Sequence, residues 1–173
     1  LDIEFTQADL AEVHFLKAQY YALHLEFLKA LTSYDRAISL KYENAKVYQN
    51  RGHIHYKLAN YSLALTDYQR ALDLGAPPIA LYKNMAQSAY LSQDYDSAIR
   101  NYSALIKLQP TFEHLQNRAL SYLQVDNKAD ARKDLQACLN LLKTKILDQE
   151  DIPLQESLSQ IETALSQLAE PAE

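Results

Sequence analysis

The chain has 173 residues, of which 48% are apolar and 23% are charged, so it is long enough to bury one substantial hydrophobic core. Only two glycines and five prolines are present, which excludes a collagen-like chain, a low-complexity chain and a fold of many short β-turns, and favours helices. The single cysteine excludes an internal disulfide, and the net charge of −5 argues against a surface that binds nucleic acid as a whole.

The beginning of the chain carries no membrane or export signal. No apolar run approaches the roughly 18 to 20 residues of a membrane span, and residues 1–4 lack the basic and then apolar order of a signal peptide. The absence of an initial Met indicates an excised or processed product. We expect a cytoplasmic location. Residues 1–10 are a lead-in, in which Thr6 and Asp9 are spaced as a helix cap.

A repeat of about 34 residues follows the lead-in. Tyr48 recurs as Tyr82 and Asn50 recurs as Asn84, and the same register runs back to residue 11 and forward to residue 145. The sequence therefore predicts one domain over residues 1–173 that contains four repeats, at 11–44, 45–78, 79–111 and 112–145.

Each repeat has the pattern of two helices joined by a short polar turn. Apolar residues recur at spacings of three and four on both sides of the turn. Small residues face each other across each predicted hairpin, as Gly52 and Ala64 do in the second repeat, and they allow the two helix axes to approach closely. Tyr34, Tyr68 and Tyr102 are expected to fill the wider space toward the next repeat.

The repeat pattern stops after Lys145, and a further helix is predicted over residues 153–169. One side of it is an apolar stripe, made of Leu154, Leu158, Ile161, Leu165 and Leu168. We expect it to cap the fourth repeat, because the end of a repeat stack otherwise exposes its core. A helix for dimerisation or for a partner is the alternative.

These features together resemble the tetratricopeptide repeat family, over residues 11 to about 145. The resemblance implies an all-α, right-handed α-solenoid of antiparallel helix pairs, whose first helices line a concave groove. The chain departs from the family at the seventh repeat position, where Lys17, Arg51 and Arg118 stand in place of the usual leucine.

The resemblance also places a set of side chains in the groove. The predicted peptide-binding residues are Phe15, Leu16, Gln19, Gln49, Asn50, His53, Tyr56, Lys83, Asn84, Gln87, Tyr90, Gln116 and Asn117. Phe15 and Leu16 form an apolar patch, and Tyr56 and Tyr90 form ring walls.

Asn50, Asn84 and Asn117 occupy one repeat position and are expected to form a row. A carboxamide pairs with both the N–H and the C=O of a peptide unit, so the row is suited to an extended peptide. The alternative is that asparagine merely suits an exposed polar position. A carboxylate clamp of the kind that binds chaperone tails is not supported, because its cationic positions fall on Phe15, Ala80 and Asn84.

No residue pattern indicates catalysis, a metal or another cofactor. His53 and His55 are two residues apart on a helix and point in different directions, and Cys138 occupies a packing position. The sequence thus predicts a non-enzymatic protein interaction module, an adaptor or scaffold with a protein or peptide partner. Two alternatives remain, namely self-association through the apolar first helix, as a monomer or weak dimer, and a regulatory region of a larger protein.

Overall fold

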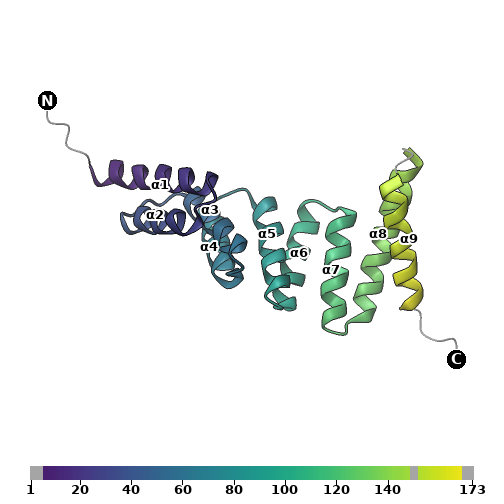
Figure 1. Ribbon diagram of the computed structural model, residues 1–173. Helices are drawn as coiled ribbons and strands as arrows, with labels where there is room; N and C mark the ends of the chain where they lie inside the picture. The colour runs from purple at the N-terminus through teal and green to yellow at the C-terminus, as the bar shows by residue number, and fades with distance from the viewer. Residues whose placement is uncertain (1–5, 149–151, 169–173) are drawn as a thin grey trace. The chain divides into compact units, whose positions relative to one another are not determined.

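The computed structural model describes residues 6–148 and 152–168, and these residues form nine α-helices and no strand. In chain order the helices are α1 (Gln7–Leu23), α2 (Phe27–Ser39), α3 (Ala45–Lys57), α4 (Tyr61–Asp73), α5 (Pro78–Leu91), α6 (Tyr95–Leu108), α7 (Phe112–Gln124), α8 (Lys128–Asp148) and α9 (Ile152–Gln167) (Figure 1). The all-α fold of consecutive antiparallel helix pairs is therefore confirmed.

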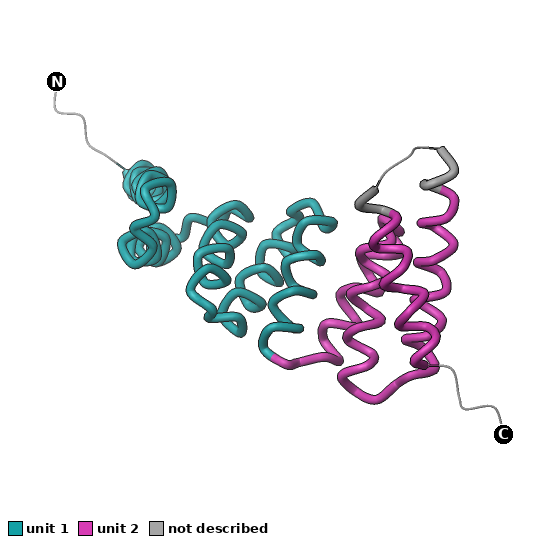
Figure 2. Tube along the Cα trace, turned by 45° about the vertical axis from the view of Figure 1, so that its right-hand side comes forward, with its two compact units in different colours: residues 1–92 teal, residues 93–173 magenta. Residues whose placement is uncertain are grey.

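The chain divides into two compact units (Figure 2). Unit 1 ends at Ser92 and contains α1 to α5, whereas unit 2 begins at Gln93 and contains α6 to α9. The predicted third repeat gives its first helix to unit 1 and its second helix to unit 2. The repeat boundaries and the single domain stay predictions.

The start of α1 shows how local sequence sets a helix end. Thr6 Oγ1 accepts a hydrogen bond from Asp9 N at 3.1 Å, and Thr6 N donates to Asp9 Oδ2 at 2.8 Å. This reciprocal pair satisfies two backbone N–H groups that have no partner within the helix. The predicted cap is confirmed.

The turns inside the hairpins share one backbone conformation. Leu25, Ala59, Gln93 and Asp126 occupy the same repeat position, and each has a φ between 56° and 63°. After α3, Ala59 N donates to Tyr56 O and Asn60 N donates to His55 O, which is the paired bonding that closes a helix end. The chain thus builds this turn repeatedly without glycine, against a local cost of about 1 kcal/mol.

The core of unit 1 lies between the hairpins. Phe15, Ala18, Tyr34, Val47 and Ile54 are buried in one cluster, and a second cluster joins α4 to α5. Gly52 is required for the close contact of α3 with α4, because a Cβ atom there would lie only 3.0 Å from the ring of Tyr68. The small residue predicted at this contact is confirmed.

In unit 2, α9 covers the face of α8. Ile161 is 1% exposed and packs with Leu139 and Leu142, and Leu158 and Leu165 border the same cluster. Lys143 and Glu162 form an ion pair of 3.3 Å across the two helices. The capping helix is confirmed and spans Ile152–Gln167. The side chain of Leu154 and residue 169, both included in the prediction, lie outside the described part.

Candidate functional site: an amide-lined pocket in unit 1

A pocket of about 410 Å³ lies on unit 1 and is lined mainly by α1 and α3, with one residue each from α2 and α5. Its lining residues are Gln19, Ala22, Leu23, Tyr34, Gln49, Asn50, His53, Ile54 and Asn84. Five of them were predicted from the sequence, namely Gln19, Gln49, Asn50, His53 and Asn84. The pocket therefore brings together four carboxamide side chains and one imidazole.

The helical repeat explains why these side chains meet. Asn50 and His53 are three residues apart on α3 and so share a face of that helix. Asn84 occupies on α5 the repeat position that Asn50 occupies on α3, and both side chains are half-buried. Residues at one repeat position present the same face, and two members of the predicted row thus line one pocket.

Four lining residues were not predicted as groove residues: Ala22, Leu23, Tyr34 and Ile54. Tyr34 comes from α2, the second helix of its hairpin, and is 1% exposed. Sequence reasoning assigned it to packing between repeats, which it also does. Tyr34 could have been recognised as a pocket residue because a tyrosine at a core position needs a hydrogen-bond partner for its hydroxyl group.

Asn50 supplies that partner. Burial raises the pKa of the Tyr34 hydroxyl, and a side-chain hydrogen bond with Asn50 acts in the opposite direction. The contact restrains the Asn50 carboxamide from one side, while a carboxamide carries more donors and acceptors than one tyrosine can satisfy. Asn50 therefore keeps hydrogen-bonding capacity beyond its contact with Tyr34.

The surroundings of His53, another polar residue of the lining, lower the pKa of its ring. Burial lowers the pKa of the His53 ring, and the positive charge of Lys57 lowers it further. None of the residues that line the pocket is acidic or permanently cationic. The pocket is thus a neutral surface of donors and acceptors, with apolar contacts from Ala22, Leu23 and Ile54.

We expect NMR titration of the His53 ring to give a pKa below 6.5, and Lys57→Gln to move it back toward 6.5. A histidine whose folded pKa is lowered stabilises the fold above pH 6.5, and this contribution is lost as the pH falls from 6.5 through the folded value. Lys83→Gln is the control, because Lys83 does not contribute to the shift. An unchanged pKa in Lys57→Gln would contradict the proposed cause.

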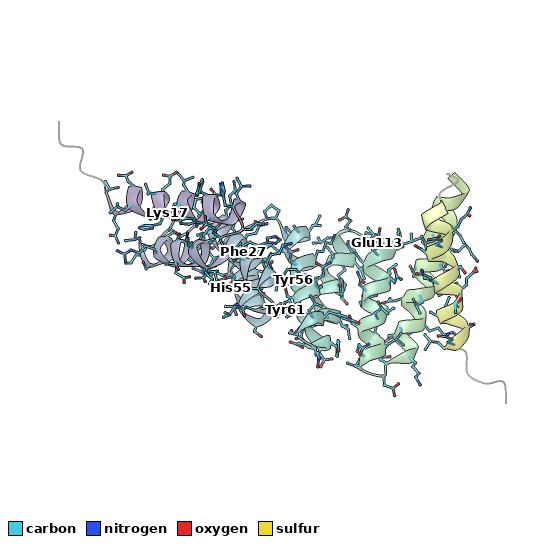
Figure 3. All side chains as sticks on the ribbon, viewed as in Figure 1. Lys17, Phe27, His55, Tyr56, Tyr61 and Glu113 are labelled. Atoms are coloured by element: carbon cyan, nitrogen blue, oxygen red, sulfur yellow. The ribbon has the colours of Figure 1, made fainter. Side chains whose placement is uncertain are left out.

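Other predicted groove residues of unit 1 lie outside the pocket lining. Phe15 is 7% exposed and its ring centroid lies 5.2 Å from that of Tyr42, so it belongs to the core and not to an apolar patch on the groove. Leu16 is 54% exposed on α1. Tyr56 lies against Tyr61 at the α3–α4 turn, with ring centroids 5.7 Å apart (Figure 3).

The others divide between α5 and unit 2. On α5, Lys83 is exposed and both Gln87 and Tyr90 are half-buried. Gln116 and Asn117 are half-buried on α7. Their membership of a continuous groove stays a prediction.

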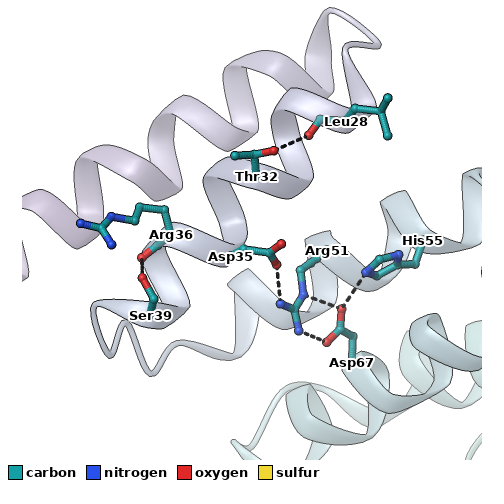
Figure 4. Close-up of polar contacts among 8 residues, drawn as sticks. All are labelled: Leu28, Thr32, Asp35, Arg36, Ser39, Arg51, His55 and Asp67. Atoms are coloured by element: carbon teal, nitrogen blue, oxygen red, sulfur yellow. Dashed lines mark hydrogen bonds and ion pairs between the residues drawn. The ribbon is translucent and has the colours of Figure 1, made fainter.

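An ionic cluster around Arg51 that the sequence did not predict lies in unit 1 (Figure 4). Arg51 on α3 donates from Nε and Nη2 to the two carboxylate oxygens of Asp67 on α4, at 2.8 and 2.6 Å. Its Nη1 donates to Asp35 Oδ1 on α2 at 2.7 Å. Burial lowers the pKa of Arg51, but the contacts with Asp67 and Asp35 outweigh it and raise the pKa. The guanidinium of Arg51 on α3 therefore links this helix to both α2 and α4.

An equivalent arginine–aspartate pair is present in unit 2. Arg118 donates to both oxygens of Asp134, at 2.7 and 2.6 Å, and its Nη1 donates to Ser103 Oγ at 2.9 Å. The sequence signal was present, because Arg51 and Arg118 both replace the leucine usual at that repeat position. A carboxylate sixteen residues downstream of each arginine would have identified the pairs.

Cys138 and His114 are both buried and make hydrogen-bond contacts with backbone carbonyl groups. Cys138 is buried and donates to Phe112 O at 3.3 Å, and burial raises the pKa of its thiol to about 11. His114 is also buried, and its Nδ1 lies 2.9 Å from Gln109 O. Among the described residues there is no group of three or more histidine, cysteine or acidic side chains that would hold a metal ion. The expectation that Cys138 packs in the core is confirmed.

No helix in residues 6–148 and 152–168 is long and apolar enough to cross a membrane.

Comparisons with known proteins define the class of this fold. Residues 45–74 match the family model described as "Tetratricopeptide repeat". A search of curated protein sequences finds no match. Among solved structures, YrrB, described as a TPR protein, is 18% identical with a TM-score of 0.70, covering 87% of this chain and 74% of that one.

Two structures of MamA are also similar to the chain in fold. One is 20% identical with a TM-score of 0.67, covering 78% of this chain and 80% of that one. The MamA of Desulfovibrio magneticus RS-1 is 14% identical with a TM-score of 0.68, covering 94% and 97%. These structures show that the fold of the described chain is that of an α-helical repeat stack. Residues 45–74 have the sequence of a tetratricopeptide repeat, and the helix pairs on either side of them have the same fold.

Proposed function

We propose that the amide-lined pocket of unit 1 binds an extended segment of a partner protein, and that the protein is a non-catalytic adaptor or scaffold. The observation that supports this is the convergence of Gln19, Gln49, Asn50 and Asn84 on one pocket of about 410 Å³. Four carboxamides in one hollow offer both hydrogen-bond donors and acceptors without charge. Such uncharged donors and acceptors complement the C=O and N–H groups of a peptide main chain.

The spacing of the helices fits an extended peptide. Neighbouring helices lie roughly 8 to 10 Å apart, which matches about three residues of extended chain at roughly 3.3 Å each. We infer that Asn50 and Asn84, at one position of successive repeats, bind peptide units about three residues apart. Asn117 continues the series in the sequence.

The apolar part of the pocket supplies selectivity for side chains. Leu23 is 80% exposed and, with Ala22 and Ile54, gives the pocket an apolar side. We infer that the bound segment carries an apolar side chain between polar or acidic residues, since the nearby charges include Lys57 and Lys83. YrrB is described as having an unusual peptide-binding site, which supports a peptide ligand for this fold. A cytoplasmic location stays part of the proposal.

The test uses a synthetic peptide of about ten residues, selected for binding to the intact protein from a randomised library. We expect Asn50→Ala with Asn84→Ala to lower its affinity by at least about tenfold, because each lost hydrogen bond is worth about 0.5 to 1.5 kcal/mol. Isothermal titration calorimetry measures the change.

Gln69→Ala is the matched control, because Gln69 is an exposed carboxamide on α4 that donates to Asp73 Oδ1 and lies outside the pocket. It should bind the peptide as the unchanged protein does. Equal affinity of the doubly substituted and unchanged proteins would refute the proposed role of the asparagines.

A further inference from the structure

A second pocket, of about 730 Å³, lies on unit 2 along one side of α8. The polar side chains of its lining are all exposed, and they are Lys128, Arg132, Lys133, Gln136 and Asn140. None of the lining residues is acidic. The pocket therefore gathers three cations on a chain whose net charge is −5.

Two of these cations replace apolar residues of the repeat. Lys128 and Arg132 occupy positions at which the three earlier hairpins carry a half-buried aromatic residue and a half-buried aliphatic residue. These pairs are Phe27 and Leu31, Tyr61 and Leu65, and Tyr95 and Ile99. Helix stability does not explain the exchange, because Lys128 begins α8, where the helix dipole favours acidic residues. The exposed cations are thus particular to α8.

Helix geometry aligns the polar side chains in a row. Lys128, Arg132, Gln136 and Asn140 are spaced by four residues, so they share one side of α8 and follow one another at about 6 Å along its axis. The small side chains of Ala129 and Ala137 lie beside this row and leave room for a ligand. Leu168, which follows α9 and packs at the edge of the unit 2 core, adds an apolar wall.

The cations are accessible to a ligand. Lys128 lies 3.6 Å from Asp126 and Lys133 lies 2.8 Å from Asp130, but the two lysine side chains are 69% and 77% exposed, and such surface pairs are weak. Within the described residues, Arg132 forms neither an ion pair nor a hydrogen bond. Its guanidinium can therefore bind a carboxylate through two parallel hydrogen bonds.

We propose that this pocket binds an extended acidic segment of a partner protein, with carboxylates at alternate residues. Alternate residues of an extended chain lie about 6.6 Å apart and point to the same side, which matches the rise of about 6 Å from Lys128 to Arg132. Gln136 and Asn140 continue the row with uncharged donors and acceptors for the main chain, and Leu168 contacts an apolar side chain of the segment.

A protein segment fits this pocket better than a nucleic acid. The chain as a whole is acidic and repels a phosphate backbone, whereas the amide and apolar parts of the lining match a peptide. The proposal is separate from that for unit 1, because no residue lines both pockets.

The probe is a fluorescently labelled peptide of about six residues, the extended length that spans the roughly 18 Å from Lys128 to Asn140. It carries glutamate at alternate positions and one leucine. Fluorescence anisotropy at low salt measures its binding to the full chain at up to about 1 mM protein. We expect saturable binding that weakens as the salt concentration rises, and Lys128→Gln with Arg132→Gln to raise the dissociation constant at least about tenfold.

Arg100→Gln with Lys107→Gln on α6 is the matched control, because it removes one arginine and one lysine from exposed positions of unit 2 outside the pocket. The affinity of this variant should stay within about twofold of that of the unchanged protein, since its charges lie outside the contact. Circular dichroism verifies that both variants keep their helix content.

The absence of binding at about 1 mM protein, or an equal effect of the control variant, would overturn the proposal. A single-stranded oligonucleotide of the same charge that binds as tightly as the peptide would also overturn it, because the surface would then recognise phosphate. Glu170 and Glu173 follow Leu168 in the sequence. Binding that requires Glu170→Gln with Glu173→Gln would assign the pocket to these glutamates of the same chain and would refute an external partner.

Discussion

Asp67→Ala is expected to cost unit 1 about 3 to 5 kcal/mol of folding free energy, the range for breaking a buried ion pair by removing one partner. The Asp67 side chain is 3% exposed and accepts two hydrogen bonds from Arg51. Its loss leaves the guanidinium, whose side chain is only 21% exposed, without its buried counter-charge. Urea unfolding and hydrogen exchange of the α3 and α4 amides measure the effect.

Asp35→Ala provides the control within the same cluster. Asp35 accepts from the same arginine at 2.7 Å, but its side chain is 62% exposed, so its removal should cost less than about 1 kcal/mol. Replacing both partners with apolar residues, as Arg51→Met with Asp67→Leu, should cost less than Asp67→Ala alone. Equal losses from Asp35→Ala and Asp67→Ala would show that burial does not set the value of the pair.

Ile161→Ala is expected to destabilise unit 2 by about 2 to 5 kcal/mol, as for other buried isoleucines. Ile161 is 1% exposed and joins α9 to the core around Leu139 and Leu142. The stability of a repeat protein is distributed along the stack, so the loss should be local. Hydrogen exchange should show faster exchange in α7 and α8 and unchanged exchange in α3 and α4.

Gln160→Ala is the control for this experiment, because Gln160 is the exposed neighbour of Ile161 on α9. Its effect should stay within about 0.5 kcal/mol. Equal loss of protection in α3 and in α8 after Ile161→Ala would contradict a local capping role and indicate one cooperative unit.

Of the nine residues that line the pocket, five were predicted from the sequence and four were not. Asn50 and Asn84 were predictable because equal positions in a repeat face the same way, whatever the details of packing. Tyr34 was not, because its ring serves the core and its hydroxyl meets Asn50 from another helix. Phe15 was predicted to line the groove, but its side chain is buried in the core of unit 1.

The helical hairpins, their small-residue contacts, the cap at Thr6 and the terminal helix over α8 were all predictable from the sequence. These depend on periodicity and on local hydrogen bonds, which act over a few residues along the chain. The bonds of Arg51 to Asp67 and Asp35 and the exposure of the apolar side of α1 came from the tertiary structure. Both depend on which helix lies beside which, and the sixteen-residue spacing between arginine and carboxylate indicates a pair only once α3 and α4 are known to be neighbours.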